Sequence, residues 1–584
     1  MLALVSLSIA LTWLACAVVL IGTGSLILEF FSEKYLLTEA FWSGLCATVA
    51  ILETYHFLRP VDRALTLALI LLGILGIFRN RISLAQKLRQ ARSGESWQTL
   101  CYFVAVYAIA LRASGACEHY DTGFYGALAV RWIETYPVVP GLANLFAQLG
   151  FNSSVFLCVA ALGQGIWRDL AHHLFIGLLL AGFFASIIPA WFRLFRERAS
   201  LASDWFPALL LVPATFWATN GEIVGTNTDL PASICCLAAA LFLFRALDGD
   251  PRERDEVESC RASLVVAMLL FSLAVTFKLS SAAFACVGWI VALLRVWPLS
   301  RNSEGKRFSI GATIALSVAI VLPWILRGVV LSGYPLYPST VFPIHADWMV
   351  PIQDVRYQEV FVRSWARITH VPVSETQGFR WIGEWFQVFS RNREGFLIPL
   401  TISIAGFTAT AYGRITLKME KFSRGMLLLL PGGIGLVSWF FTAPALRFGE
   451  AFIWTAAATL GSLGAAAALK SARLKYRRMV LAFLLLITAW CIYPRTLWRV
   501  FYRPLLSVHG FIRLPEAEVV ARKTSSGLTV YMPAEGNQCW DAPLPCSPYF
   551  RRGLRLRHPE SLKDGFISGG TSDDLVPLPH PPEP

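Results

Sequence analysis

The stretch GACEHYDTGFYGALAVRWIETYPVVPGLANLFAQLGFNSS, residues 115–154, is the first long part of the chain that is neither an apolar segment nor a basic loop. An apolar segment that ends near Arg112 precedes it. Carboxylates are costly to place at a membrane face, and there they indicate a functional site by default. The ionisable side chains of the stretch are Glu118, His119, Asp121 and Glu134. The sequence therefore places the candidate functional site here.

The composition of the whole chain is typical of a polytopic membrane protein. Its 584 residues are 55% hydrophobic and 15% charged, whereas soluble proteins contain about 25% charged residues. The 20 Trp and 16 Tyr suit aromatic belts at both membrane interfaces. The net charge of +13 is explained by Lys and Arg in short cytoplasmic loops, which excludes nucleic acid as a partner.

Apolar segments of spanning length recur along the chain, and about fourteen of them are expected to cross the membrane as helices. The first has no basic start and is longer than a signal peptide requires, so we interpret it as a true span. We expect an all-α bundle over residues 1–494. The segments are 2–24, 36–57, 61–78, 98–113, 172–192, 204–220, 229–246, 262–277, 282–297, 309–330, 395–412, 426–442, 450–468 and 478–494.

The basic loops between these segments all fall on one side of the membrane if residues 155–166 do not cross it. The positive-inside rule makes that side cytoplasmic. Residues 155–166 are too short to span and are expected to lie at the interface or to re-enter. The outer face then receives residues 114–171, the large loop 331–394 and the C-terminal region 495–584. Both termini are expected to be extracytoplasmic.

Apolar residues within 122–150 recur at helical spacing. Leu128, Trp132 and Ile133 predict one short amphipathic helix, which Pro137 and Pro140 end. A second is predicted through Leu142, Leu145, Phe146 and Leu149. Two such helices in the outer loop are expected to lie on the membrane surface.

The C-terminal region has a different character, with fewer apolar residues and more Pro and Arg. SGLTVYMP predicts a short buried strand. Cys539 and Cys546 enclose a Pro-containing turn outside the membrane, so a disulfide is favoured. A metal site is the alternative, but two ligands alone do not make one. Residues 575–584 are expected to be disordered.

Asp121 is the strongest candidate for a catalytic residue, flanked by Glu118 and His119 as further candidates. An inverting glycosyl transfer needs a carboxylate to take the proton of an acceptor hydroxyl. The alternative is that Asp121 caps the helix that follows. Asp229 begins a later span with Pro231 in its first turn, so it is equally a candidate for acceptor positioning and for capping. Glu222 lies in the same loop.

A lipid-phosphate substrate requires cations at the outer surface, where Arg grips phosphate with two hydrogen bonds and Lys acts as a point charge. Lys278, Arg327 and Arg447 are the candidates, with snorkelling at helix ends as the alternative. Tyr334 and Tyr337 in LSGYPLYPST either shape a sugar pocket or form a plain interface turn. No cofactor is certain from the sequence, and a divalent metal at the carboxylates stays open.

The segment HYDTGFYGALAVRWIETYPVVPGLANLFAQLGFNSS, with SGYPLYPS and CWDAPLPCSPY, resembles bacterial polytopic membrane proteins of the LIC_10190 type, relatives of GT-C glycosyltransferases. The resemblance implies a GT-C-like bundle in the bacterial inner (plasma) membrane. It also implies a polyprenyl-phosphate sugar donor, Asp121 as the base and Asp229 as a second-loop acid. Three spans precede the one that leads into the Asp121 loop, whereas the simplest GT-C layout has one.

We therefore expect a membrane glycosyltransferase that transfers a sugar from a polyprenyl-phosphate donor to an unidentified glycan, lipid or protein acceptor on the extracytoplasmic face. The alternatives are a polysaccharide polymerase or ligase, or a transporter of lipid-linked glycans. A polymerase or ligase would use Arg-rich outer loops. Loop 331–394 contains Arg356, Arg363, Arg367, Arg380, Arg391 and Arg393.

Overall fold

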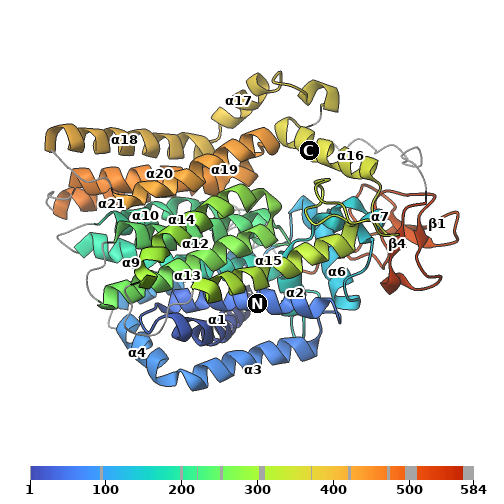
Figure 1. Ribbon diagram of the computed structural model, residues 1–584, viewed down its shortest axis with the longest axis horizontal. Helices are drawn as coiled ribbons and strands as arrows, with labels where there is room; N and C mark the ends of the chain where they lie inside the picture. Colours follow the sequence, from blue (N-terminus) through green and yellow to red (C-terminus); the bar gives the residue numbers. More distant parts are fainter. Residues whose placement is uncertain are drawn as a thin grey trace.

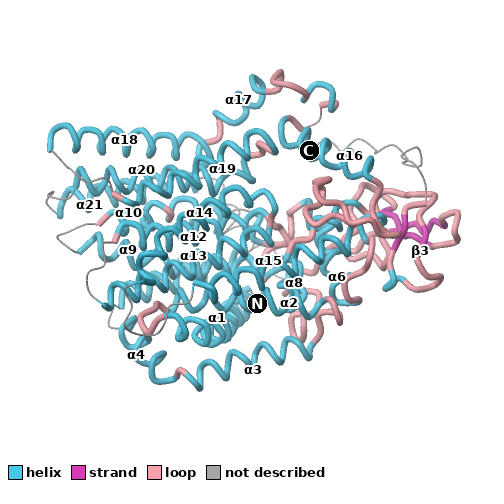
Figure 2. Tube along the Cα trace, in the orientation of Figure 1, coloured by secondary structure: helices cyan, strands magenta, loops and turns pink. Residues whose placement is uncertain are grey.

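The computed structural model is dominated by helices, and among the residues that it describes the strands lie in the C-terminal region (Figure 2). Figure 1 shows the long helices side by side, with α6, α7 and the strands toward one end. The residues that the structure describes are 2–92, 96–196, 201–219, 221–249, 254–301, 310–369, 371–417, 423–469, 474–492 and 510–569.

Nine helices within these residues are long and apolar enough to cross a membrane, and a bent pair makes a tenth. The bent pair is α3 (Arg63–Arg79) and α4 (Arg81–Arg92), which meet at 80°. This part of the molecule is therefore an all-α membrane bundle. The nine are built on α1 (Leu2–Phe31), α9 (Phe175–Arg196), α12 (Asp229–Asp248), α13 (Arg254–Phe277), α14 (Ala282–Arg301), α15 (Ile310–Ser332), α18 (Ile398–Leu417), α19 (Leu429–Thr442) and α20 (Leu446–Leu469).

The remaining expected spans also fall on helices, but these helices do not share that length and apolarity. One reason is charge, since α2 carries the buried Glu39 and Glu53. Another is a break at Leu210, with Pro207 before it and Pro213 after it. The count of fourteen thus stays a prediction. These helices are α2 (Leu37–His56), α5 (Ser96–Ala113), α10 (Ala202–Leu209), α11 (Leu211–Thr219) and α21 (Leu474–Ile492).

The centre of the bundle is formed by α12 and α13, whose side chains are almost all buried. Small residues let other helix pairs approach closely, as is usual in membrane bundles. A Cβ on Gly44 of α2 would lie 1.9 Å from the carbonyl oxygen of Leu20 in α1. A Cβ on Gly464 of α20 would lie 2.4 Å from the carbonyl oxygen of Gly406 in α18. These backbone contacts pack the helix pairs closely together.

The loop 114–171 contains the first expected amphipathic helix as α6 (Ala127–Thr135), preceded by the short π-helix η1 (Thr122–Gly126). The second is shorter than expected, with α7 (Leu142–Leu145) followed by a 3-10 turn, η2 (Ala147–Phe151). Their apolar residues, including Trp132 and Leu142, are buried in the protein. Neighbouring protein therefore covers the apolar faces of these helices, and their position at the membrane surface stays a prediction.

Residues 155–166 begin with α8 (Ser154–Leu162), a helix of 9 residues. At 1.5 Å per residue it is roughly half the length that a bilayer requires. Most of α8 is buried, and it packs against α2 and α6. This fits the expectation that the segment does not cross the membrane.

Loop 331–394 contains α16 (Ile352–Arg367) and α17 (Ile382–Ser390), with the 3-10 turn η6 (Val373–Thr376) between them. The inner side of α17 is aromatic. Trp385 lies 5.8 Å from Trp439 of α19, measured between ring centroids. The opposite side leaves Phe386 and Val388 exposed.

The C-terminal region forms two small antiparallel pairs, β1 (Val519–Lys523) with β2 (Thr529–Pro533), and β3 (Arg555–Leu556) with β4 (Phe566–Ile567). The predicted strand SGLTVYMP is β2, with Val530 as its buried residue. The predicted Cys539–Cys546 disulfide is present. Residues 575–584 lie outside the described residues.

Candidate functional site

Four predicted charged residues from four separate elements meet at one place. Arg447, at the start of α20, lies 3.4 Å through Nη1 from Oδ2 of Asp121 and 3.1 Å through Nε from Oδ2 of Asp229. Asp229 also forms an ion pair with Lys278, which follows α13. We call Asp121, Asp229, Lys278 and Arg447 the charged cluster. Arg447 is its bridge, because its guanidinium contacts both carboxylates.

Asp121 is positioned by its neighbours and does not cap a helix, since its side chain makes no capping hydrogen bond at η1. The next residue, Thr122, accepts the backbone N–H of Thr226 at 3.0 Å through its hydroxyl. This bond ties the Asp121 segment to the loop before α12. The Asp121 side chain is 25% exposed, so its carboxylate meets both Arg447 and solvent.

Asp229 is buried, with 4% of its side chain exposed. Its own backbone N–H donates to Oδ1 of Asn227 at 2.7 Å, and Asn227 Nδ2 donates to Glu222 at 3.1 Å. Asn227 thus satisfies a donor at the start of α12, and the Asp229 carboxylate pairs with two cations. Burying a carboxylate is tolerated when it is paired in this way.

Aromatic rings hold both cations from the side. Lys278 Nζ lies 3.7 Å from the ring centroid of Phe448. The Arg447 guanidinium lies 4.8 Å from the ring centroid of Trp365 in α16. The indole N–H of Trp385 donates to the carbonyl oxygen of Pro444 at 2.7 Å, just before Arg447. Loop 331–394 therefore helps to fix the bridging arginine.

A hollow beside the cluster is lined by polar groups and by rings, and includes about 210 Å³ of empty space, some of it open to solvent. Asp121 does not line this hollow and reaches it only through Arg447. The hollow is lined by residues that include Asp229, Lys278, Ser280, Ser281, Arg447 and Phe448.

His119 is buried beside the cluster, and burial lowers its pKa. Asp121 and Glu222 oppose this shift, and Arg447 and Lys278 add to it. The imidazole is therefore neutral at pH 7. Glu118 lies next to Gly221, where a Cβ would be 3.4 Å from both Glu118 Oε2 and Arg112 Nη2. His119 thus lies beside the cluster and is affected by its charges.

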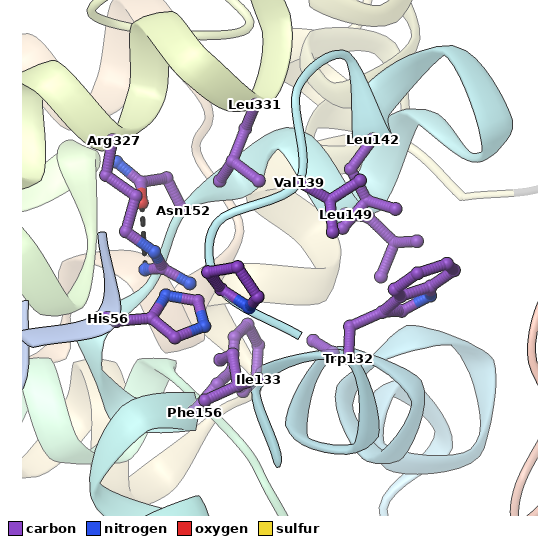
Figure 3. A pocket seen from close by; sticks show the side chains of 12 residues that line it. His56, Trp132, Ile133, Val139, Leu142, Leu149, Asn152, Phe156, Arg327 and Leu331 are labelled. Atoms are coloured by element: carbon purple, nitrogen blue, oxygen red, sulfur yellow. Dashed lines mark hydrogen bonds between the residues drawn. The ribbon is translucent and has the colours of Figure 1, made fainter. Parts of the chain in front are cut away.

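Arg327 does not join the cluster. Its Nη1 donates to Oδ1 of Asn152 at 2.9 Å and lies 3.9 Å from Oε2 of Glu53. Figure 3 shows Arg327, Asn152 and His56 at one side of a separate pocket, with apolar side chains such as Leu331 and Leu142 lining the rest. Arg327 is 3% exposed, so the structure places it in a buried ion pair away from Asp121.

Tyr334 and Tyr337 also lie apart from the cluster. Tyr334 is fully buried and its hydroxyl donates to the carbonyl oxygen of Val350 at 3.1 Å. Tyr337 packs against Phe151 and a small core around Val355. Neither lines the hollow, so the interpretation as a packed turn fits them better than a sugar pocket.

The cluster pairs two carboxylates with two cations. Within the described ranges, no group of three or more His, Cys, Asp or Glu side chains is placed to hold a metal. The carboxylates of Asp121 and Asp229 instead face Arg447 and Lys278. Two adjacent cations with rings beside them are the groups that bind a phosphate, with Arg as a two-pronged donor.

Some contributors were not singled out from the sequence. Trp365 lies in the middle of α16 and carries no charge or motif that would mark it. Ser280 and Ser281 follow Lys278 directly in TFKLSS, and Phe448 follows Arg447. Ser280, Ser281 and Phe448 could have been found from the sequence, because each lies within three residues of a predicted cation.

The fold and the cluster define the class of the protein: an all-α integral membrane protein with a charged site where several helices end. Residues 7–454, well over half of the chain, match the family described as "Domain of unknown function (DUF8201)", and the chain belongs to that family. The match includes the whole charged cluster. No curated protein and no solved structure matches the chain.

Proposed function

We propose that this protein is an inverting membrane glycosyltransferase of the GT-C type that uses a polyprenyl-phosphate-linked sugar. In this proposal the outer face carries the site, both termini are extracytoplasmic, and the bundle has fourteen spans in the bacterial inner (plasma) membrane. The resemblance to LIC_10190-type proteins and the placement of basic loops support this orientation.

The observation that carries the proposal is that Arg447 contacts both Asp121 and Asp229, and that Lys278 forms an ion pair with Asp229. A glycosyl transfer needs a base for the acceptor and cations for the leaving phosphate in one place. Asp121 is the more exposed carboxylate of the cluster, at 25% against 4% for Asp229, so it is the one that an acceptor hydroxyl can reach.

The chemistry follows from these positions. Asp121 takes the proton of the acceptor hydroxyl as its oxygen forms a bond to the anomeric carbon. The bond from that carbon to the phosphate oxygen breaks, and the lipid phosphate leaves with the electron pair. Arg447 and Lys278 stabilise the charge on the departing phosphate. Attack opposite the leaving group inverts the sugar.

The polymerase or ligase alternative rests on the arginines of loop 331–394, and two of these already have partners inside the loop. Arg363 pairs with Glu359 at 2.7 Å, and Arg367 donates to the carbonyl oxygen of Thr376 at 2.8 Å. Both guanidinium groups therefore already bind partners within the same loop. This favours the glycosyltransferase proposal, and a transporter of lipid-linked glycans remains the other alternative.

The test is transfer of radiolabelled sugar in membranes that contain the full chain, with a polyprenyl monophosphate sugar or a lipid-linked oligosaccharide as donor. We expect transfer from the monophosphate donor and its loss in Asp121→Asn. The matched control is Asp347→Asn, since Asp347 is an exposed aspartate paired with Arg557 outside the cluster. Transfer only from the oligosaccharide donor would favour the polymerase or ligase.

A further inference from the structure

The C-terminal region contacts the chain on either side of Asp121, at Tyr120 and at Gly123. We call residues 537–546, which contain the disulfide, the disulfide loop. Gln538 Nε2 donates to the carbonyl oxygen of Tyr120 at 2.9 Å. The backbone N–H of Trp540 donates to the carbonyl oxygen of Gly123 at 3.0 Å. These two bonds hold the main chain on either side of Asp121.

Side chains strengthen the same contact. The hydroxyl of Tyr120 donates to Oδ1 of Asn537 at 2.5 Å. The Trp540 ring lies so close to Gly123 that a Cβ there would be 2.5 Å from it. Glycine, which lacks a Cβ, is required at this approach. The disulfide loop is therefore fitted to the backbone next to Asp121.

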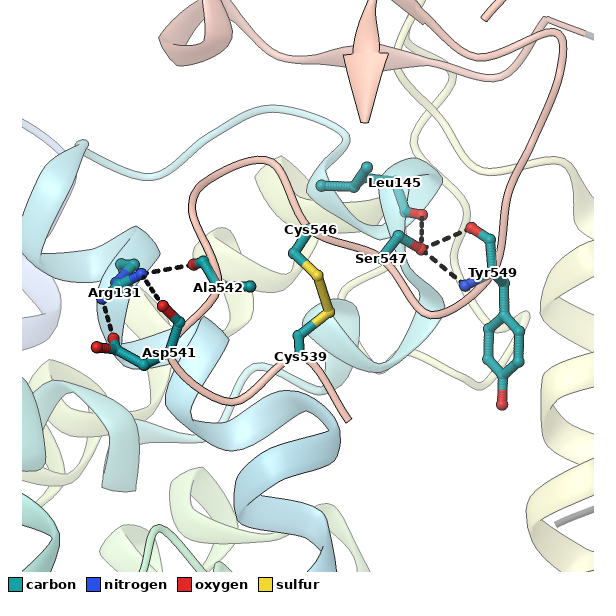
Figure 4. Close-up of a disulfide and its surroundings, with 8 residues drawn as sticks. All are labelled: Arg131, Leu145, Cys539, Asp541, Ala542, Cys546, Ser547 and Tyr549. Atoms are coloured by element: carbon teal, nitrogen blue, oxygen red, sulfur yellow. Dashed lines mark hydrogen bonds and ion pairs between the residues drawn. A yellow bond between two sulfur atoms is a disulfide. The ribbon is translucent and has the colours of Figure 1, made fainter. Parts of the chain in front are cut away.

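A third attachment lies one helix further along. Figure 4 shows Arg131 of α6 directed at the disulfide loop, where it forms an ion pair with Asp541. Arg131 Nη1 also donates to the carbonyl oxygens of Asp541, at 2.9 Å, and of Ala542, at 2.5 Å. The loop thus holds the chain from Tyr120 to Arg131.

The other side of the disulfide loop is anchored on β2. The backbone N–H of Tyr531 donates to the carbonyl oxygen of Pro545 at 2.9 Å, and that of Ser547 donates to Tyr531 at 3.0 Å. Cys539 and Cys546 are both fully buried. One end of the disulfide loop bonds to the chain beside Asp121, and the other end bonds to β2. The Cys539–Cys546 bond links these two ends directly.

We propose that the disulfide loop is a clamp that positions Asp121. Asn537, Gln538 and Trp540 are positioning residues that act through the backbone of Tyr120 and Gly123. The clamp lies outside the region 7–454 that matches the family. The proposal that the clamp positions the chain around Asp121 is argued from these contacts alone. Its effect on sugar transfer rests on the proposed function.

The closed disulfide is required for the clamp. Reduction by an external dithiol transfers two electrons and two protons, breaks the sulfur–sulfur bond and leaves two thiols, while the dithiol becomes a disulfide. The two ends of the loop are then joined only through the chain between them. Gln538 and Trp540 can separate from Tyr120 and Gly123, and Asp121 loses its fixed position relative to Arg447.

Hydrogen–deuterium exchange on the full chain in lipid nanodiscs tests the clamp. Reduction followed by alkylation is expected to raise amide exchange of peptides within 116–131 at least tenfold. Peptides from α12 and α13 are expected to be unchanged. Unchanged exchange within 116–131 after complete reduction would overturn the proposal.

A second variant separates the clamp from general loss of structure. Trp540→Ala keeps both cysteines and removes the ring that packs on Gly123, so it is expected to raise the same exchange rates. The matched control is Glu535→Ala, an exposed residue of the same region, with exchange like that of the parent.

For Trp540→Ala we expect kcat to fall about tenfold while KM for the sugar donor is unchanged. The reason is that a misplaced base slows the chemical step without weakening donor binding. Equal exchange in Trp540→Ala and the parent would contradict the clamp. Raised exchange in a protein that never transfers sugar would support the clamp and contradict only the proposed function.

Discussion

Two groups of paired charges in this bundle have the same chemistry and differ in exposure. In the charged cluster, the side chains of Arg447 and Asp121 are 28% and 25% exposed. In the pair of Arg327 with Glu53, the side chains are 4% and 0% exposed. A buried ion pair without access to solvent supports the fold, whereas an exposed one can exchange its partner for a substrate. Exposure therefore separates the candidate site from a structural pair.

Asp121→Asn is expected to have the largest effect in the exposed group. Loss of a general base lowers transfer by about 100- to 10,000-fold. The partly exposed pair with Arg447 contributes little to folding, so thermal stability should change by less than about 1 kcal/mol. Rates of sugar transfer and thermal unfolding of the same preparation measure both. A variant that unfolds early and transfers normally once folded would reverse the comparison.

Arg327→Met tests the buried group. It leaves the Glu53 carboxylate in the interior without a cation, which costs about 3–5 kcal/mol of stability. The transfer rate of the folded fraction should not change. Adding Glu53→Gln removes the unpaired charge and should restore most of the loss. Equal stability of the single and double variants in denaturant titrations would show that the pair does not support the fold.

Arg447→Lys is a smaller change that keeps the charge of the cluster. A lysine ammonium cannot reproduce the guanidinium fork that contacts Asp121 and Asp229 together. We expect transfer to fall about tenfold with stability unchanged. The control is Arg363→Lys, at an exposed arginine of α16, for which the rate should be that of the parent. Full activity of Arg447→Lys would mean that the bridge is not needed.

The smallest expected effect concerns Glu134 of α6. Burial, and then Asp169, raise the pKa of Glu134 to about 7, against the opposing effect of Arg131. A carboxyl with a raised pKa binds its proton more tightly when folded, so its contribution to stability is present near pH 4 and is lost as the pH rises through 7.

Glu134→Gln removes this dependence. The variant should be more stable than the parent above pH 7, and the difference should vanish toward pH 4.5. Glu134 as a whole residue is exposed, whereas its carboxyl lies against the backbone at Gly163, where a Cβ would be 2.7 Å from Oε1. Partial screening by solvent therefore keeps the effect small. Melting temperatures from pH 4 to pH 8 measure it, and a constant difference over that range would contradict the assignment.

The sequence was sufficient to find the long apolar helices and the charges at their ends, because apolar length and interrupting cations are local signals. It did not reveal α16 and α17 in loop 331–394. Asp121, Asp229, Lys278 and Arg447 were each predicted singly. Their meeting depends on which helices are neighbours, which a single sequence does not encode locally. Arg327 gave the same signal as Lys278, yet the face of α15 that carries it turns toward Glu53.

The same limit applies to α6 and to the span count. The spacing of Leu128 and Trp132 predicts a helix correctly, but periodicity cannot tell whether protein or lipid covers the apolar face. The break at Leu210, between Pro207 and Pro213, divides one expected span. Trp365 is found only from the structure, since its role is contact with Arg447.

The most direct test of the central claim is binding of a polyprenyl phosphate, measured by native mass spectrometry on Arg447→Gln and Arg327→Met. Our account predicts that Arg447→Gln loses the bound lipid phosphate, while the folded fraction of Arg327→Met binds it like the parent. Equal binding by both variants, or loss only in Arg327→Met, would contradict the assignment of the charged cluster as the site.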